Sequence, residues 1–399
     1  MKQGWELKKL GDVCETGAGG TPLKTHKDYY EGGTIPWLLS GEVSQGEIFE
    51  AKNFITEKGL KNSSAKLFPP NTVLVAMYGA TAGQVGILRF EAATNQAVCG
   101  ILPNDKTIPE YLFYCFLEKK EELIAQAVGG AQPNISQIKI KNTKIPLPPL
   151  PEQQRIVSIL DEAFAAIAKA KANAEQNLRN AKELFESYLQ GVFENGNWET
   201  KTLKEVAKVF GRGKSKHRPR NWEGLYGGNY PFIQTGEVRN ANKFITEYTQ
   251  TYNEVGLAQS KLWKKGTICI TIAANIAETA ILDFDACIPD SIIGFEVDEK
   301  KADLNFAYYL LQYFKAELQK LGKGSAQDNI NLGTFENQYF PFPTLKEQQT
   351  IVRQLDALRA ETQKLEAVYQ KKIDDLEELK KSILQKAFAG ELKTSQEVV

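Results

Sequence analysis

Basic side chains crowd residues 201–220, and they have the clearest chemical use in the chain. The stretch holds eight lysines and arginines but a single acidic residue, Glu205. Phosphate groups attract such clusters, and arginine can donate two hydrogen bonds to one guanine edge. A solvated surface loop is the alternative for any basic run. The candidate DNA-contacting residues of this stretch are Arg212, Lys214, Lys216, His217, Arg218 and Arg220.

A milder basic loop lies near the start of the chain, between residues 17 and 33. Its glycines permit close approach of the backbone to a ligand. The candidate contact residues of this loop are Lys24, Thr25, His26 and Lys27. The two loops occupy corresponding places in the two halves of the chain but differ in sequence. A constant frame around a variable loop is what two recognition modules for two different DNA sequences would require.

A group of carboxylates could imitate a metal-dependent nuclease. Asp290, with Asp298, Glu299 and Lys300, offers carboxylates for Mg²⁺ and a lysine to steady an attacking water. In the first half, however, Asn95 stands at the position that we assign to Asp290. A surface loop near a turn is therefore the favoured interpretation, and a self-contained nuclease is the hypothesis to be tested against it.

Other sequence motifs of catalytic or metal-binding sites are either wrongly spaced or lack enough residues of the required type. Residues 211–215, GRGKS, resemble the end of a phosphate-binding P-loop, but Lys208 stands where that motif needs a glycine. The chain has only two histidines, which leaves little for a zinc site or for acid–base catalysis by histidine. We therefore predict a chain that is not an enzyme and that binds no metal and no cofactor of its own.

Length and composition limit the class of protein. A chain of 399 residues is too long for one ordinary core, so two to four domains are expected. The formal net charge is zero, so any surface for nucleic acid must be local. Five cysteines without a Cys-x-x-Cys pair indicate reduced thiols in a cytoplasm. The sequence shows neither a signal peptide nor a membrane-spanning run, so a cytoplasmic location without a membrane partner is expected.

The chain repeats itself at an offset near 195 residues. Trp5-Glu6 matches Trp198-Glu199, and the triplet Glu-Gln-Gln occurs at both 152–154 and 347–349. Further matches pair 40–43 with 235–238, and the sequence FITE at 54–57 with FITE at 244–247. A period this long indicates a duplicated domain, since solenoid repeats are only about 20–50 residues long.

Each half divides into a mixed α/β (α+β) domain and a long helix. Short β-rich runs between Gly- and Pro-rich turns, followed by one apolar helix, mark the mixed domain. We place the first domain at 1–148, its helix at 149–195, the second domain at 196–343, its helix at 344–393 and a tail at 394–399. The start signals are Pro151 and a capping box from Thr344 to Glu347, and Gly196 and Gly390 suit helix ends.

One apolar stripe runs along each long helix in steps of three and four residues. Two such helices would most simply bury their stripes against each other as an antiparallel coiled coil. The alternative is that each helix packs on its own globular domain, which explains the helix length less well. The predicted packing residues are Ile156, Leu160, Ile167, Leu178, Phe185, Tyr188, Ile351, Leu355, Leu358, Leu365, Leu376, Leu379 and Ile383.

These motifs, in their order, resemble the specificity (S) subunit of type I restriction–modification enzymes, the HsdS family. The resemblance rests on PLPPLPEQQRIVSILD and its second copy, FPFPTLKEQQTIVRQLD, and on GGTPLK, IPWLLSGEV, MYGATAGQVGI, ATNQAVCGILP and GGAQPNIS. It covers nearly the whole chain in the order recognition domain, helix, recognition domain, helix. The second recognition domain keeps fewer of these residues, since AANIA stands at 273–277 where the first has GATAG at 79–83.

The resemblance implies a DNA-reading role without chemistry of its own. In that family, each recognition domain reads one half of a split double-stranded DNA target, and the helices set the gap. The S subunit holds two methyltransferase (M) subunits, which use S-adenosylmethionine, and works with two restriction (R) subunits, which use ATP and Mg²⁺. The alternative for this chain is a coiled-coil scaffold that joins proteins without reading DNA.

Overall fold

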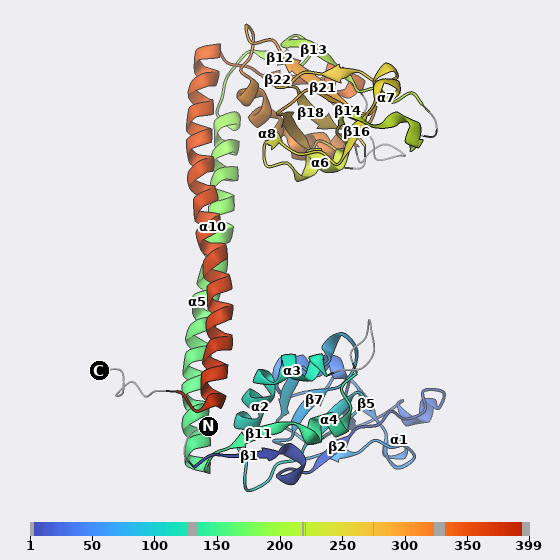
Figure 1. The fold of residues 1–399 in the computed structure, drawn as a ribbon, viewed down its shortest axis with the longest axis vertical. Helices are drawn as coiled ribbons and strands as arrows, with labels where there is room; N and C mark the ends of the chain where they lie inside the picture. The colour runs from blue at the N-terminus through green and yellow to red at the C-terminus, as the bar shows by residue number, and fades with distance from the viewer. Residues whose placement is uncertain are drawn as a thin grey trace, which may run out of the picture. The chain divides into compact units, whose positions relative to one another are not determined.

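In the computed structural model, the chain forms two compact units, each built around one mixed domain. The structure describes residues 4–126, 134–217, 219, 221–273, 275–322 and 332–392. Unit 1 comprises Met1–Glu175 and Gln370–Val399, and unit 2 comprises Gln176–Tyr369. Two helices of 45 residues, α5 (Leu150–Glu194) and α10 (Leu345–Ala389), each contribute one segment to either unit (Figure 1).

The domain of unit 1 is built on a five-stranded sheet of order β2-β10-β7-β8-β4. Its neighbours pair antiparallel, except that β4 runs parallel to β8. A four-stranded sheet of order β5-β3-β9-β6 and the pair β1-β11 complete the strands. The strands are β1 (Glu6–Lys9), β2 (Thr16–Ala18), β3 (Ile35–Leu38), β4 (Gly46–Ile48), β5 (Phe54–Ile55), β6 (Leu67–Phe68), β7 (Val73–Ala76), β8 (Val85–Leu88), β9 (Ala92–Thr94), β10 (Val98–Ile101) and β11 (Lys144–Leu147).

The central strands of this sheet are buried on both faces, which explains their continuous apolar sequences. In β7, Val73 and Val75 point to a core that contains helix residues, whereas Leu74 and Ala76 point to a second core with Leu38 and Phe68 of the other sheet. The helices of unit 1 besides α5 and α10 are α1 (Glu57–Lys61), α2 (Pro109–Glu118), α3 (Lys120–Ala125), α4 (Gln137–Asn142) and the 3₁₀ turns η1 (Leu10–Asp12), η2 (Lys27–Tyr29), η3 (Ser40–Gln45) and η4 (Gly79–Thr81).

Unit 2 repeats these sheets with the orders β13-β21-β18-β19-β15, β16-β14-β20-β17 and β12-β22. Its strands are β12 (Thr200–Thr202), β13 (Ala207–Arg212), β14 (Tyr226–Phe232), β15 (Phe244–Ile245), β16 (Gln250–Tyr252), β17 (Leu262–Trp263), β18 (Ile268–Thr271), β19 (Thr279–Leu282), β20 (Ala286–Cys287), β21 (Ile292–Val297) and β22 (Tyr339–Pro341). Its other helical elements are α6 (Thr235–Asn240), α7 (Glu254–Ala258), α8 (Leu304–Gly322), α9 (Leu332–Glu336) and η5 (Glu223–Leu225). The predicted duplication of a mixed domain is confirmed.

One repeat match proposed from the sequence is wrong. The residues FI of the first FITE form β5, antiparallel to β3 in the four-stranded sheet, whereas those of the second form β15, parallel to β19 in the five-stranded sheet. The true counterpart of β5 is β16, because Pro36 pairs with Phe54 as Pro231 pairs with Thr251. A two-residue strand is placed by its sheet neighbours, so identical letters do not fix its role.

The middle residue of each Glu-Gln-Gln triplet fixes the first turn of a long helix by hydrogen bonds. The Gln153 side chain is fully buried; its amide donates to the Pro148 carbonyl (2.9 Å) and its oxygen accepts from the Ile108 N–H (3.0 Å). Ile108 caps α2, so one side chain connects the start of α5 to the start of the domain's main helix. Both connections are hydrogen bonds between one buried side-chain amide and backbone groups.

The second triplet makes the same connection. The Gln348 amide donates to the Pro343 carbonyl (2.7 Å), and its oxygen accepts from the Asp303 N–H (2.7 Å) just before α8. A tyrosine from each main helix adds a second link, since Tyr114 donates to Asp161 and Tyr309 to Asp356, both at 2.5 Å. Each domain is thus attached to its helix at two equivalent points.

The predicted helix ends are partly correct. α5 begins at Leu150, one residue before Pro151, and α10 begins at Leu345, directly after Thr344, whose N–H donates to Glu347 (3.0 Å) in the predicted capping box. Gly390 follows α10 with φ +78°, as a terminating glycine does. Gly196 does not have a positive φ; it is needed because a Cβ there would lie 2.3 Å from the Trp198 ring.

The two long helices run antiparallel within each unit (Figure 1). In unit 1, Lys171 pairs with Glu377 (2.5 Å), and the Lys380 ammonium lies over the Phe164 ring (4.9 Å). In unit 2, Tyr188 donates to Gln354 (3.3 Å). Residue numbers rise along one helix as they fall along the other, which confirms the antiparallel pair.

The apolar stripes serve both the helix pair and the domain cores. In unit 1, Ile156 and Leu160 of α5 and Leu384 and Phe388 of α10 belong to the core of the first domain. The alternative of helices packed on globular domains is therefore realised at the helix ends alongside the coiled coil. Of the predicted packing residues, the buried ones are Ile156, Leu160, Ile167, Phe185 and Leu355, the half-buried ones are Leu178, Ile351, Leu358, Leu376 and Ile383, and the exposed ones are Tyr188, Leu365 and Leu379.

Candidate nucleic-acid interface

Three loops meet at one end of the five-stranded sheet of unit 1. Since β10 runs antiparallel to both β2 and β7, the ends of β2 and β7 lie beside the start of β10; Ala18 pairs with Cys99 and Ala76 with Val98. The loops are 19–28 after β2, 77–84 after β7 and 95–97 before β10. We call this set the first rim.

Unit 2 has the equivalent set, which we call the second rim. Arg212 at the end of β13 pairs with Ile293, and Thr271 at the end of β18 pairs with Ile292, so the same strand ends converge. The loops of the second rim are 213–224, 272–278 and 288–291. All candidate DNA-contacting residues named from the sequence and described by the structure lie on these two rims or at the strand end that enters one.

A glycine starts the variable loop of each rim for the same reason. The Gly19 N–H donates to the Val98 carbonyl (3.1 Å), and the Gly213 N–H donates to the Ile292 carbonyl (2.8 Å). A Cβ on Gly19 would lie 2.1 Å from the Thr94 side chain, and one on Gly213 would lie 2.3 Å from a backbone carbonyl. Only glycine fits so close an approach to a neighbouring strand.

The far end of each loop is fixed in the same way as well. The Thr56 N–H donates to the Tyr29 carbonyl (2.9 Å), and the Asn253 N–H donates to the Leu225 carbonyl (3.0 Å). Between these fixed ends, the loops comprise nine residues, 20–28, in the first domain and eleven, 214–224, in the second. One frame therefore holds two loops that differ in length and in sequence.

The candidate residues of the first loop all face solvent. Lys24, Thr25, His26 and Lys27 are exposed, and the His26 ring stacks on Tyr29 with centroids 4.8 Å apart. Asp28, at the end of the loop, forms an ion pair with Lys58. The loop thus offers a small excess of positive charge and one stacked aromatic pair.

The second loop is more basic and more firmly fixed. Arg212, Lys214 and Lys216 are exposed. The Lys216 and His217 N–H groups both donate to the Gln259 side-chain oxygen (2.6 and 3.0 Å), and the His217 ring stacks on Trp222 with centroids 4.7 Å apart. Arg212 also donates to the Asp290 carbonyl (2.8 Å).

Arg218 and Arg220 were also proposed from the sequence. Both lie outside the described residues.

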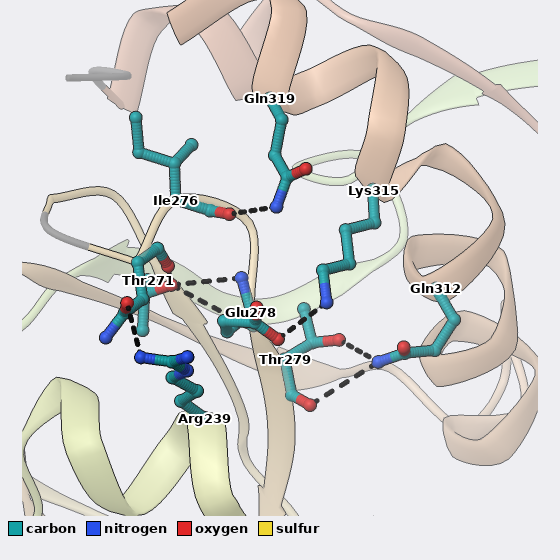
Figure 2. A network of polar contacts seen from close by, with 9 residues as sticks. Arg239, Thr271, Ile276, Glu278, Thr279, Gln312, Lys315 and Gln319 are labelled. Atoms are coloured by element: carbon teal, nitrogen blue, oxygen red, sulfur yellow. Dashed lines mark hydrogen bonds and ion pairs between the residues drawn. The ribbon is translucent and has the colours of Figure 1, made fainter. Parts of the chain in front are cut away.

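A polar network, which the sequence did not reveal, holds loop 272–278 of the second rim against α8 (Figure 2). Gln319 donates to the Ile276 carbonyl (3.1 Å), and Lys315 pairs with Glu278 (2.8 Å). Gln312 donates to Thr279 at the start of β19 (2.5 Å). Three successive turns of one helix face thus fix the loop.

Ala277 in this loop has φ +61°, where the first rim has Gly83 at φ +78°. The second rim therefore keeps the backbone conformation of the first without the residue that adopts it most easily.

The nuclease hypothesis fails on geometry. Asp290 precedes β21 and Asp298 follows it, so a strand of six residues, about 20 Å long, separates the two carboxylates. The counterpart of Asp290 is Gln96, not Asn95, because the Lys214 N–H donates to the Ile288 carbonyl as the Gly20 N–H donates to the Thr94 carbonyl. Within the described residues, no three His, Cys, Asp or Glu side chains are grouped so as to hold a metal ion.

Two further expectations concern the interior and the helices. All five cysteines are buried as free thiols, and burial raises the pKa of the Cys99 thiol to about 12.

Among the helices described, none combines the length and the apolar character needed to cross a bilayer.

Comparison with known families gives one match in each half of the chain. A family model described as the type I restriction modification DNA specificity domain matches residues 2–176 and 195–377. The MjaIX type I restriction enzyme specificity subunit of Methanocaldococcus jannaschii is 26% identical over 98% of this chain and 94% of its own length. The EcoR124I/EcoR124II specificity subunit of Escherichia coli is 29% identical over 39% of this chain and 40% of its own.

Solved structures share the fold. A chain from a structure titled for complex assembly and conformational transition of the type I R-M system has a TM-score of 0.81, with 22% identity over 98% of this chain and 99% of its own. The HsdS subunit from Thermoanaerobacter tengcongensis has a TM-score of 0.63, with 20% identity over 98% of both chains. At this identity the likeness concerns the arrangement of elements only.

Proposed function

Because the chain belongs to the type I restriction–modification DNA specificity family, we propose that it is the DNA-reading subunit of such a complex and that each rim reads one half of a split duplex target. The observation that carries this proposal is the common frame. Gly19 and Tyr29 hold a nine-residue loop, and Gly213 and Leu225 hold an eleven-residue loop of different sequence. Two different readers on one repeated scaffold suit a target with two unlike halves.

The side chains on the rims suit contact with a duplex. Lysines and arginines neutralise phosphates, and loop side chains of both rims can reach base edges or sugars. The pairs His26–Tyr29 and His217–Trp222 add flat, partly exposed surfaces to both loops. Phosphate contacts position the protein, whereas contacts with base edges supply the sequence preference.

The helix pair supplies the spacing. Each helix of 45 residues is about 68 Å long at 1.5 Å per residue. The two ends of an antiparallel pair of equivalent helices are themselves equivalent, a symmetry of the kind that B-DNA has about its local two-fold axes. Exposed apolar residues on α10, Leu365, Val368 and Leu379, leave surface for partner helices.

The chemistry of the complex belongs to its other subunits. Two methyltransferase subunits would supply S-adenosylmethionine-dependent methylation, and two restriction subunits would supply ATP- and Mg²⁺-dependent translocation and cleavage. This chain would bind none of these cofactors and would act as a non-catalytic guide. The target adenine in a duplex must be flipped out before it can be methylated, and the methyltransferase partner would do this.

A domain exchange tests the proposal. Residues 1–148 are replaced by the first domain of another member of the family, and the methylated motif is read by methylation-sensitive sequencing of cells that also express the methyltransferase partner. We expect one half of the motif to change while the other half and the gap stay constant. A change in both halves, or in neither, would contradict the assignment of one half-site to each rim.

The scaffold alternative is tested with the reconstituted complex. A DNA reader should bind duplex DNA with an affinity that falls steeply with salt, because phosphate contacts release counterions. A complex that assembles with its methyltransferase partner yet binds no DNA would favour a protein-joining scaffold.

A further inference from the structure

A lysine outside the variable loop points to an additional contact on the second rim. The Lys261 ammonium lies 3.4 Å from the centroid of the Trp263 ring, and the indole is fully buried. The ring therefore holds the end of a side chain that would otherwise be mobile. Lys261 is partly buried and forms no ion pair with any described residue. Its charge is held in place by the ring, and Glu296 acts on it without forming an ion pair within the described residues.

The fold brings Lys261 to the second rim. It immediately precedes β17, which runs antiparallel to β20, and Leu262 pairs with Cys287 at the end of β20. The next residue along the chain, Ile288, accepts the backbone hydrogen bond from Lys214 (3.0 Å). The Ser260 hydroxyl also donates to the Lys214 carbonyl (2.8 Å). Lys214 is thus fixed by its backbone beside the residue that precedes Lys261.

The charge of Lys214 acts on the Lys261 ammonium group. Burial is the main cause that lowers the pKa of Lys261; Glu296 opposes this, and the charge of Lys214 lowers the pKa further. Two like charges near each other, one of them partly buried, are unfavourable until an anion joins them. The Lys214 side chain is exposed and that of Lys261 is half-buried, so an anion can reach Lys214 from solvent.

We propose that Lys214 and Lys261 form a binding site for one backbone phosphate of the duplex at the second rim, and that the first rim has no equivalent. This inference rests on the proposed DNA-reading function. A lysine ammonium is a compact point charge that suits a phosphate; lysine can also contact guanine, but one anion that joins two ammonium groups is a phosphate and not a base edge. The site therefore holds the DNA and does not choose its sequence.

The first domain cannot build the same pair. Phe68 is the counterpart of Trp263, because it pairs with Ala92 as Trp263 pairs with Ala286, so Lys66 is the counterpart of Lys261. Gly20, however, stands in place of Lys214, and a Cβ on Gly20 would lie 2.3 Å from the backbone of residues 64–65. A lysine at position 20 would displace that backbone.

The two halves of the target are consequently held unequally. From residue 214 to residue 224 the second loop has four basic residues and one acidic residue, whereas the first loop, 20–28, has two lysines and one aspartate. With the additional Lys214–Lys261 phosphate contact, the second half-site supplies the larger share of the salt-dependent affinity. The first half-site depends more on contacts that salt does not weaken.

The test measures DNA affinity against salt concentration for the full chain in complex with its methyltransferase partner. The probe is a duplex that carries the methylated motif. The variants are Lys214→Met, Lys261→Met and the double variant. The control is Lys264→Met, which makes the same change of charge as each single variant in the same domain but on a lysine that is paired with Asp285 (2.8 Å) and is largely exposed.

In the double variant we expect the slope of log K against log[salt] to become shallower by about 0.9, the value for one phosphate contact. The methylated motif should stay unchanged, and the control should keep the wild-type slope. An unchanged slope in the double variant, or an equal change in the control, would overturn the proposal. If Lys261→Met disturbs folding around Trp263, the exposed Lys214→Met still decides, since a shared phosphate requires a shallower slope from it alone.

A second measurement locates the phosphate. Single phosphates of the duplex are replaced one at a time by uncharged methylphosphonates. One replacement in the second half-site should weaken wild-type binding and have no further effect on the double variant. Equal sensitivity of wild type and double variant at every position would overturn the proposal. A wild-type complex that binds no DNA would instead refute the proposed function, so the two failures are distinguishable.

Discussion

Replacement of Gln348 by leucine should destabilise unit 2 far more than the same change at its neighbour. The Gln348 side chain is fully buried and hydrogen-bonds two backbone groups, the Pro343 carbonyl and the Asp303 N–H. Leucine has a similar volume but offers neither a donor nor an acceptor. Gln349, the next residue, is exposed, so Gln349→Leu is a matched control with the identical chemical change.

The size of the effect follows from the two backbone groups. A buried donor or acceptor that loses its partner costs about 1–3 kcal/mol. With two such groups, Gln348→Leu should lower the free energy of unfolding by about 2–6 kcal/mol, a large part of the about 5–15 kcal/mol typical of a domain. For a unit of this size, such a loss corresponds to a fall in melting temperature on the order of 10 °C. The control should shift it by about 1 °C or less.

The assay is thermal unfolding of the full chain, combined with hydrogen exchange of the amides in α2 and α8. Gln348→Leu should accelerate exchange in α8 and leave α2 unaffected, whereas Gln153→Leu should do the reverse. In the methylated motif, Gln348→Leu should weaken recognition of the half-site read by the second rim, and Gln153→Leu should weaken recognition of the half-site read by the first rim. Equal melting shifts for Gln348→Leu and Gln349→Leu would refute the reasoning, because the buried amide would then contribute nothing beyond its volume.

Three further predictions follow from local geometry. Ala277→Gly should raise the stability of unit 2 by about 0.5–1 kcal/mol in chemical denaturation, because it removes a left-handed alanine. Hydrogen bonds from Thr344 hold the pKa of Glu347 below its ordinary value, so this stabilisation is complete above the unfolded-state pKa and is lost as the pH falls through the folded-state value. Thr344→Ala should therefore reduce the acid sensitivity of unfolding as the pH falls below the ordinary pKa of a glutamate side chain. Gly213→Ala should abolish recognition of the second half-site, whereas Gly211→Ala, where a Cβ meets nothing within 4 Å, should leave the methylated motif intact.

The sequence predicted the large elements because their signals are long. The offset of about 195 residues and the two apolar stripes are each supported by many positions, so a few residues that depart from the pattern do not obscure it. The FITE match failed for the opposite reason: a match of four residues, of which two form a strand, carries too little information to choose between two sheets. Gly196 lies two residues beyond the end of α5, as predicted, but without a positive φ, and its close contact with the ring of Trp198 could not be predicted from the sequence.

The candidate site was predictable in outline only. Charge and position marked the two loops, but Lys261 lies 41 residues beyond the basic stretch, and no local pattern connects it with Lys214. The stripes likewise missed Leu384 and Phe388, which pack in a domain core and so need not follow the spacing of a coiled-coil seam. Such residues are brought together by tertiary packing, which a periodic pattern does not encode.

The packing of Phe388 against Tyr111, with ring centroids 5.3 Å apart, has a consequence for synthesis on the ribosome. The interior of the first domain includes side chains that are translated more than 230 residues after the last strand of that domain. During elongation, the nascent N-terminal half must wait with an apolar surface uncovered until the end of α10 emerges. Translation order and folding order therefore differ in this protein, because the first domain completes its core only when the end of α10 has been made.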